Sequence, residues 1–294
     1  CNLAAIVASN MVMIFQIMLS DGIGTFLNEF ITLIATFAGN TGETIVKAEI
    51  HELAFCLGAY IIYMLYKPKK KIWFWFLFAL AAFCFLAAFK RIAMIAMAVV
   101  FVIRILFFIP KKISPQATVK VANGIMLLCT VLLILYIAAI KADVFSMLEK
   151  AGIDTSGRAF VYSHVSNYYD FSPLFVGNGI GFLTYQLNEV ASLGVSAVHN
   201  DFLQFFIDLG FWGYILWLLS MTYLRTKYFG RKGDADTAVA ATLLIVYLLI
   251  VSSTDNTINY PLLTTVMGII IMGNQFQTKV AEQEEYLSTH AFGV

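Results

Sequence analysis

The sequence predicts an all-α fold, a polytopic transmembrane helical bundle of about eight spans with one long external loop. Of its 294 residues, 60% are hydrophobic and only 13% are charged, whereas soluble domains are about 45–50% apolar and about 25% charged. A chain of this length cannot bury so much apolar surface in a water-soluble core. Long apolar runs separated by short basic loops complete the pattern, so the bilayer is the expected solvent.

A spanning helix needs roughly 20 apolar residues, and about 17–25 are tolerated. The apolar stretch 25–38 is too short for a span at 14 residues, and it is predicted to be a re-entrant or interfacial helix. The predicted spans lie at about 3–20, 51–66, 72–89, 92–109, 121–140, 201–225, 237–254 and 260–275.

The orientation of the bundle follows from its basic loops, because lysine and arginine stay on the cytoplasmic side. With eight spans, all three basic loops fall on one face together with the C-terminal tail, 277–294. The basic loops are 67–71, 110–120 and 225–232. The opposite, external face then carries 21–50, the Lys90–Arg91 junction, 141–200 and 255–261.

The external loop 141–200 is about 60 residues long, and structureless loops beyond about 12–15 residues are usually functional or disordered. It is aromatic and punctuated by glycine, so we expect an ordered cap with short helices around 157–169 and 181–190. The chain 1–294 is then a single transmembrane domain that includes this loop and the cytoplasmic tail. Because it starts with Cys1 inside an apolar stretch, we expect further helices to precede it.

The composition does not indicate a soluble partner or a cofactor. The net charge is +1, which gives no footprint for nucleic acid. The cysteines lie in apolar runs without metal-binding spacing, so they are interpreted as core residues. His199 and Asp201 are near enough in sequence to share a divalent metal, but no third ligand is evident, and we predict no metal site.

Arg91 lies between two apolar runs, in FKRIAMIAM. A charge at mid-membrane costs about 2.5–3.5 kcal/mol or more, so the sequence predicts a break between spans at Lys90–Arg91. Two interpretations stay open, a hairpin residue that snorkels to the interface and a ligand for an anion in an external cavity.

Arg158 opens a predicted short helix, with Thr155 and Ser156 as cap-type residues before it. Basic charge at a helix N-terminus opposes the helix dipole, so this arginine is better used on an anion. The alternative is a salt bridge to Asp154 or Asp170.

His199 comes directly before the predicted span 201–225, for which Asn200 or Asp201 is a natural N-cap. Free N–H groups at such a helix end attract phosphate. We therefore interpret His199 as functional rather than as a hydrogen-bonded interfacial anchor, whereas His164 lacks such a setting and is interpreted as structural.

The segment GNGIG places Gly177, Gly179 and Gly181 at alternate positions. It follows no predicted strand, so it is interpreted as a tight turn rather than a nucleotide-binding loop. Asp208 lies two helical turns after Asp201, on the same face of the span.

These residues resemble a known family. HNDFLQFFIDLGFWGYILW, SGRAFVY with PLFVGNGIGF, and FKRIAMIAMAVV are similar to the motifs of the O-antigen ligase and O-antigen polymerase superfamily. The resemblance covers about 80–220, the ligase/polymerase-like core. Lys90 stands where the family often has serine, and Asp208 where it commonly has glutamate.

The resemblance implies a GT-C-like membrane glycosyltransferase on the external face of the cytoplasmic membrane, with no metal and no cofactor. Its implied partners are an undecaprenyl-diphosphate-linked oligosaccharide, a glycan or lipid-glycan acceptor, membrane lipids and polysaccharide-assembly proteins. The hypothesis is that Arg91 and Arg158 hold the diphosphate and that His199 deprotonates the acceptor hydroxyl. Supporting residues are Asn200, Asp201, Asp208, Gly177, Gly179 and Gly181.

Other functions stay open. Ligase and polymerase use the same donor, so the motifs do not separate them. A transporter or lipid-linked glycan flippase would carry charges within several spans and pseudo-repeated halves. Here the polar groups gather in one external loop, which favours an enzyme over a transporter or a non-catalytic scaffold.

Overall fold

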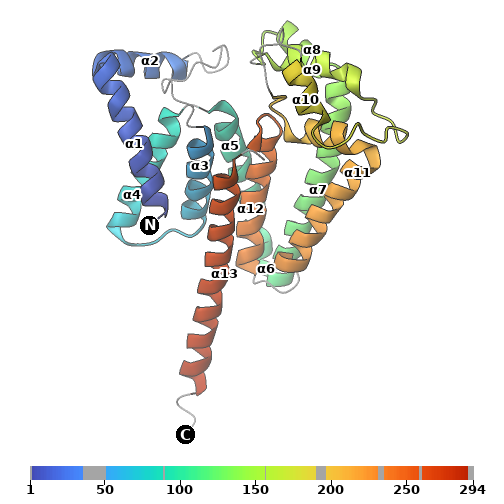
Figure 1. The fold of residues 1–294 in the computed structure, drawn as a ribbon. Coiled ribbons are helices and arrows are strands. Elements are labelled where there is room, and N and C mark those ends of the chain that lie inside the picture. The colour runs from blue at the N-terminus through green and yellow to red at the C-terminus, as the bar shows by residue number, and fades with distance from the viewer. Residues whose placement is uncertain are drawn as a thin grey trace.

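The computed structural model describes residues 2–35, 51–88, 90–155, 157–189, 197–230, 235–257 and 260–290, and every regular element in those ranges is helical. This confirms the all-α prediction (Figure 1). The α-helices are α1 (Asn2–Asp21), α2 (Ile23–Ala35), α3 (His51–Tyr66), α4 (Ile72–Ala87), α5 (Arg91–Leu106), α6 (Phe108–Ile113), α7 (Pro115–Lys141), α8 (Val144–Lys150), α9 (Arg158–Val165), α10 (Phe182–Glu189), α11 (Asp201–Arg225), α12 (Ala235–Ser252) and α13 (Pro261–His290). The 3₁₀ turn η1 (Ser166–Tyr168) follows α9, and the π turn η3 (Thr226–Gly230) follows α11.

Each predicted span coincides with an apolar helix. Five stretches in the described residues are long and apolar enough to cross a membrane: Asn2–Asp21, Arg91–Ile113, Pro115–Lys141, Asp201–Phe229 and Ala235–Ser252. The other three predicted spans coincide with shorter apolar helices at Leu53–Tyr66, Ile72–Ala87 and Pro261–Phe276. The chain is therefore a polytopic helical membrane protein.

The predicted interfacial helix is α2, and 36–38 at the end of the prediction lie outside the described residues. Gly22 has φ of 87°, a conformation that glycine adopts without strain, and it turns the chain between α1 and α2. As a result α2 lies across the end of α1 instead of continuing it (Figure 1). This arrangement agrees with a helix that follows the membrane surface.

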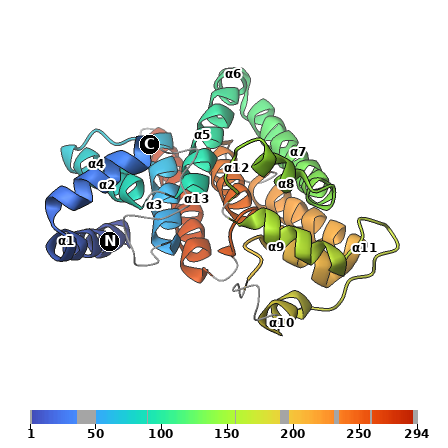
Figure 2. The ribbon, with the colours of Figure 1, turned by 90° about the horizontal axis from the view of Figure 1, so that it is seen from above.

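The buried apolar side chains form two clusters. The first joins α1, α3, α4, α5, α12 and α13 to the beginning of α7, and the second joins the end of α7 to α9, α10 and α11. Helix α12 packs against α3, α5 and α7. The helices of the two clusters diverge toward the end that carries α8, α9 and α10 (Figures 1 and 2).

The described part of the long loop, 141–155, 157–189 and 197–200, contains short helices, as the sequence predicts. The predicted helix 157–169 is α9 followed by η1, and the predicted helix 181–190 is α10. Helix α8 was not predicted. Helices α8, α9 and α10 gather at one end of the second cluster, where α8 packs against α7 and α10 against α11 (Figures 1 and 2).

Candidate active site

His199 lies at the start of α11, in a strained backbone conformation. Its φ is 50°, a left-handed value that is uncommon for a residue other than glycine. The predicted cap is confirmed at Asn200, whose side chain accepts a hydrogen bond from the Leu203 N–H at 3.0 Å. The His199 side chain is 52% exposed, so its imidazole is open to a ligand.

Two tyrosines hold Asn200. Its amide nitrogen donates to the hydroxyls of Tyr136 in α7 and Tyr162 in α9, each at 3.2 Å. Asn200 is fully buried, and burial raises the pKa of Tyr162, which keeps that hydroxyl neutral. The network fixes the start of α11, and with it the backbone of His199.

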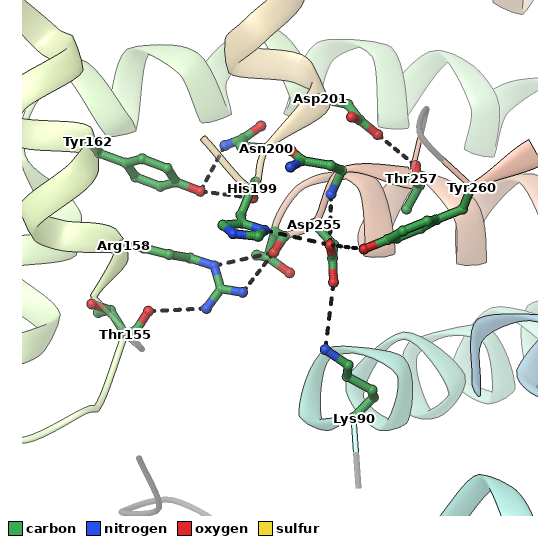
Figure 3. Close-up of polar contacts among 12 residues, drawn as sticks. Lys90, Thr155, Arg158, Tyr162, His199, Asn200, Asp201, Asp255, Thr257 and Tyr260 are labelled. Carbon is green, nitrogen blue, oxygen red and sulfur yellow. Dashed lines mark hydrogen bonds and ion pairs between the residues drawn. The ribbon is translucent and has the colours of Figure 1, made fainter. Parts of the chain in front are cut away.

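Asp255, in the turn between α12 and α13, faces His199. Its Oδ1 lies 3.8 Å from His199 Nδ1, an ion-pair distance that is too long for a hydrogen bond. The same oxygen accepts from the Tyr260 hydroxyl at 3.2 Å and from the Asn256 N–H at 2.8 Å. Its Oδ2 lies 3.9 Å from Lys90 Nζ. Figure 3 shows these groups converging on the Asp255 carboxylate.

The surroundings of Asp255 favour its charged form. Burial alone would raise the pKa of this carboxyl, but His199, Lys90 and the Asn256 N–H together lower the pKa below its ordinary value. The side chain that faces His199 Nδ1 is therefore a carboxylate anion, held in place by Tyr260 and the Asn256 N–H.

Asp201 joins α11 to the same turn. Its Oδ2 accepts from the Thr257 hydroxyl at 2.6 Å, and the Thr257 hydroxyl lies 2.5 Å from that of Ser252. Asp201 is buried, and this contact places it among structural groups. Within the described residues, no group of three or more His, Cys, Asp or Glu is arranged to hold a metal ion.

Arg158 is the first residue of α9, as predicted, and it binds backbone carbonyls. Nη2 and Nε donate to the Thr254 carbonyl at 2.7 and 3.3 Å, and Nη1 donates to the Thr155 carbonyl at 3.1 Å. The N-cap of α9 is Gly157, and the Thr155 hydroxyl accepts from the Ala159 N–H in the first turn at 3.2 Å, whereas Ser156 lies outside the described residues. Arg158 thus clamps the turn that carries Asp255 (Figure 3).

The alternative salt bridges expected for Arg158 belong to other residues. Asp154 pairs with Arg91 at 3.1 Å, and Asp170 pairs with Lys141 at 3.3 Å. In its described contacts, the Arg158 guanidinium donates only to neutral backbone carbonyls. No carboxylate in those contacts neutralises its positive charge, so the charge can attract an anion.

Arg91 begins α5, and Lys90 before it is extended, so the predicted break between spans is confirmed. Its Nη2 holds the carboxylate of Asp154, directly before Thr155. Arg91 therefore binds Asp154, and Arg158 binds the carbonyl of the next residue, Thr155. The pair with Asp154 is one more bridge between the two helical clusters.

The glycine turn packs on a break in α11. Gly210 has φ of 75° and ψ of 179°, which frees the carbonyls of Ile207 and Asp208. The N–H groups of Asn178 and Gly179 donate to these two carbonyls at 2.9 and 3.0 Å. The break divides α11 into a first part, 201–209, which we call the polar mouth because it carries the polar side chains, and an apolar second part.

Close backbone contact explains two of the glycines. A Cβ on Gly177 would lie 2.5 Å from the Gly210 nitrogen, and a Cβ on Gly210 would lie 2.3 Å from the Val176 carbonyl carbon. Gly179 and Gly181 also have positive φ, at 98° and 85°. The interpretation as a tight turn is confirmed, since each of these backbones needs glycine or strains another residue.

Asp208 supports this turn and not the group around His199. Its carboxylate accepts from the Gly181 N–H at 2.9 Å and the Leu183 N–H at 3.4 Å, at the start of α10. The shared helical face of Asp201 and Asp208 does not bring them to one partner. Asp208 therefore acts on the cap, at a distance from the imidazole.

Sequence reasoning missed Asp255 and Tyr260, and treated Lys90 only as a departure from the family pattern. The available signal was the polar run DNTINY, placed on the external face by the span count. Nothing in that run indicates which of its residues meets His199, because the contact joins positions 56 residues apart.

Comparison with known proteins gives one family. The family model described as O-antigen ligase matches residues 76–218, from α4 into α11, which includes Arg91, Arg158 and His199 but ends before Asp255. No curated protein and no solved structure matches the chain, so the GT-C-like fold stays a prediction. The match covers nearly half of the chain and supports a relation to the O-antigen ligase/polymerase superfamily.

Proposed function

We propose that the protein transfers a glycan from an undecaprenyl-diphosphate carrier to a sugar hydroxyl, at the external face of the cytoplasmic membrane. The family supports a membrane glycosyltransferase of the ligase/polymerase type. The observation that carries the proposal is the His199–Asp255 pair, which lies beside the carbonyl-bound guanidinium of Arg158.

His199 is the proposed general base. Its Nδ1 faces the Asp255 carboxylate, which leaves Nε2 to take the proton of the acceptor hydroxyl. Asp255 orients the ring and stabilises the imidazolium that forms, as a carboxylate does in other histidine-based sites. The half-exposed position of the ring allows a large glycan to reach it.

The leaving group is a diphosphate. As the bond between the anomeric carbon and the phosphate oxygen breaks, the electron pair stays on that oxygen, while the acceptor oxygen forms the new bond to carbon. Guanidinium forks bind phosphate oxygens in a bidentate manner, and fixed positive groups stabilise charge that develops in a transition state. Arg158 is the proposed primary ligand.

Arg91 has a secondary place in the proposal. Its described partner is the Asp154 carboxylate at 3.1 Å, so a bound diphosphate must share or replace that partner. This exchange would move Asp154 and, because Thr155 is the next residue, the Thr155 carbonyl to which Arg158 donates. We propose that Arg91 couples diphosphate binding to the position of Arg158. In this proposal the two arginines supply the positive charge at the diphosphate, so the reaction needs no metal ion.

The matched pair His199→Ala and His164→Ala tests the proposed base in cells that carry each variant as their sole copy. We expect His199→Ala to lower transfer by roughly 10²–10⁴-fold and to remove long surface glycan on a gel. His164 contacts Tyr168 at 3.3 Å, outside the group around Asp255, so His164→Ala should keep the parent glycan pattern. An unchanged pattern for His199→Ala, with normal protein level, would remove the general-base assignment.

A further inference from the structure

The segment between η1 and α10 exposes large apolar side chains beyond the spans. Leu174 is 88%, Val176 88% and Ile180 89% exposed. No charged residue occurs between Asp170 and Glu189. An exposed apolar surface without charged residues is typical of a site that contacts a membrane or another protein.

This segment is held in a fixed conformation. Phe171 and Phe175 turn inward and stack on Phe206, with ring centroids 5.8 and 5.6 Å apart. The Phe175 carbonyl accepts from the Phe211 N–H at 2.9 Å, and the Asn178 amide donates to the Tyr168 carbonyl at 2.8 Å. The outward display of the three apolar side chains is therefore built into the fold.

The segment that carries these three side chains is bound to α11 where the exposed apolar part of that helix begins. The backbone of the segment is hydrogen-bonded to α11 at its break, next to Trp212, which is 60% exposed, and one turn before Leu216, which is 65% exposed. Tryptophan is enriched where a span meets the membrane surface. The segment projects from the outer edge of the molecule beside α11 in both views (Figures 1 and 2).

We infer that Leu174, Val176 and Ile180 insert into the bilayer, where they contact the acyl chains of the leaflet around the polar mouth of α11. The occupant of this surface is lipid because the surface is charge-free and joins the lipid-facing side of a span. The inserted segment would fix the break in α11, and therefore His199 at its start, at one height above the hydrocarbon. The inference rests on the membrane-spanning fold and not on the proposed function.

Depth measurements on nitroxide labels test the inference. The variant Val176→Cys is made in a chain whose native cysteines are replaced, and it is reconstituted in nanodiscs of phosphatidylethanolamine and phosphatidylglycerol. Leu216→Cys is the lipid-exposed control, and Ser163→Cys, exposed on α9, is the water-exposed control. We expect the label at 176 to collide several-fold more with oxygen than with a water-soluble nickel complex, as the label at 216 does.

Two results would overturn the inference. A label at 176 that behaves like the label at 163 places the segment in water. A label shielded from both reagents, with spin–spin broadening that grows with protein concentration, assigns the surface to a second copy of the chain. If the cysteine-free chain does not fold, benzoylphenylalanine at 176 in the unaltered chain replaces the label. Its photoadduct must then be lipid, and an adduct to protein or no adduct contradicts the inference.

Discussion

At the scale of single residues, Asp255 connects three elements of the candidate site, the start of α11, the start of α5 and the turn before α13. It faces His199 and Lys90, and it accepts from Tyr260. The Lys90 ammonium gives the carboxylate a basic neighbour on a different helix from His199. Asp255 is thus the residue at which the basic group on α5 and the candidate base on α11 interact.

The residue prediction concerns Asp255→Asn. Because the folded protein lowers the pKa of Asp255 below its ordinary value of 3.8, the charged form stabilises the fold above that pH, and the gain is lost as pH falls through the folded pKa. We expect the variant to lose roughly 1–3 kcal/mol at pH 7. Thermal unfolding in detergent between pH 7 and pH 3 measures the difference between parent and variant.

That difference should be largest at neutral pH and should shrink below pH 3.8. A difference that is constant over the whole range would show that the charge of Asp255 does not stabilise the folded protein. A stability difference between parent and variant that grew in acid would show that Asp255 stabilises the fold in its protonated form, which contradicts the prediction.

At the scale of elements, α11 is built as two helical pieces on either side of Gly210. The first piece, with its Asn200 cap, holds the polar groups, and the second carries the exposed apolar residues Trp212 and Leu216. The glycine turn satisfies carbonyls that the break leaves without helical partners. The polar start of a membrane helix is therefore stabilised by the loop that precedes it in the chain.

Gly210→Ala tests this arrangement. The added methyl would approach backbone atoms of Val176 and Gly177 to 2.3–2.6 Å and would sit at positive φ, so we expect a loss on the order of 3 kcal/mol or more. Gly268 in α13 has open space around its Cβ position, and Gly268→Ala should be neutral or stabilising by roughly 0.5–1 kcal/mol. Unfolding midpoints of both variants in one detergent decide the matter, and equal effects would contradict the close-contact account.

Local chemistry predicted much of these elements. The cost of a charge at mid-membrane predicted the break at Arg91, the amide of Asn200 predicted the cap of α11, and three alternate glycines predicted a turn. The sequence did not predict the partners of the polar groups, because those depend on tertiary contacts. The Asp208 carboxylate binds the turn and the Asp255 carboxylate faces His199, whereas helical periodicity showed only that Asp201 and Asp208 share a face.

At the scale of the whole molecule, the candidate site lies on the seam between two apolar clusters. Lys90 and Asp255 lie at the ends of helices of the first cluster, and Arg158 and His199 lie at the starts of helices of the second. Polar contacts cross the seam, including the Tyr136 hydroxyl to the Ser253 carbonyl at 2.6 Å. A site built on such a seam can change when the two clusters shift, and a bound lipid diphosphate would join them.

Labelling tests the orientation of the protein in the membrane. Phe160 in α9 and Tyr228 in η3 are both exposed, and they lie toward opposite ends of the molecule. In intact cells, a membrane-impermeant maleimide should label Phe160→Cys and not Tyr228→Cys, which should react only after permeabilisation. The reverse pattern would put His199 on the side away from the proposed donor.

The central claim is that the site at His199 joins a lipid-linked glycan to a sugar hydroxyl without nucleotide or metal. The most direct measurement incubates the purified protein in nanodiscs with undecaprenyl-diphosphate-linked oligosaccharide, an acceptor glycan and EDTA, and follows product length by mass spectrometry. We predict longer glycan from the parent and from His164→Ala, and none from His199→Ala. No product from the parent, or equal product from His199→Ala, would contradict the account.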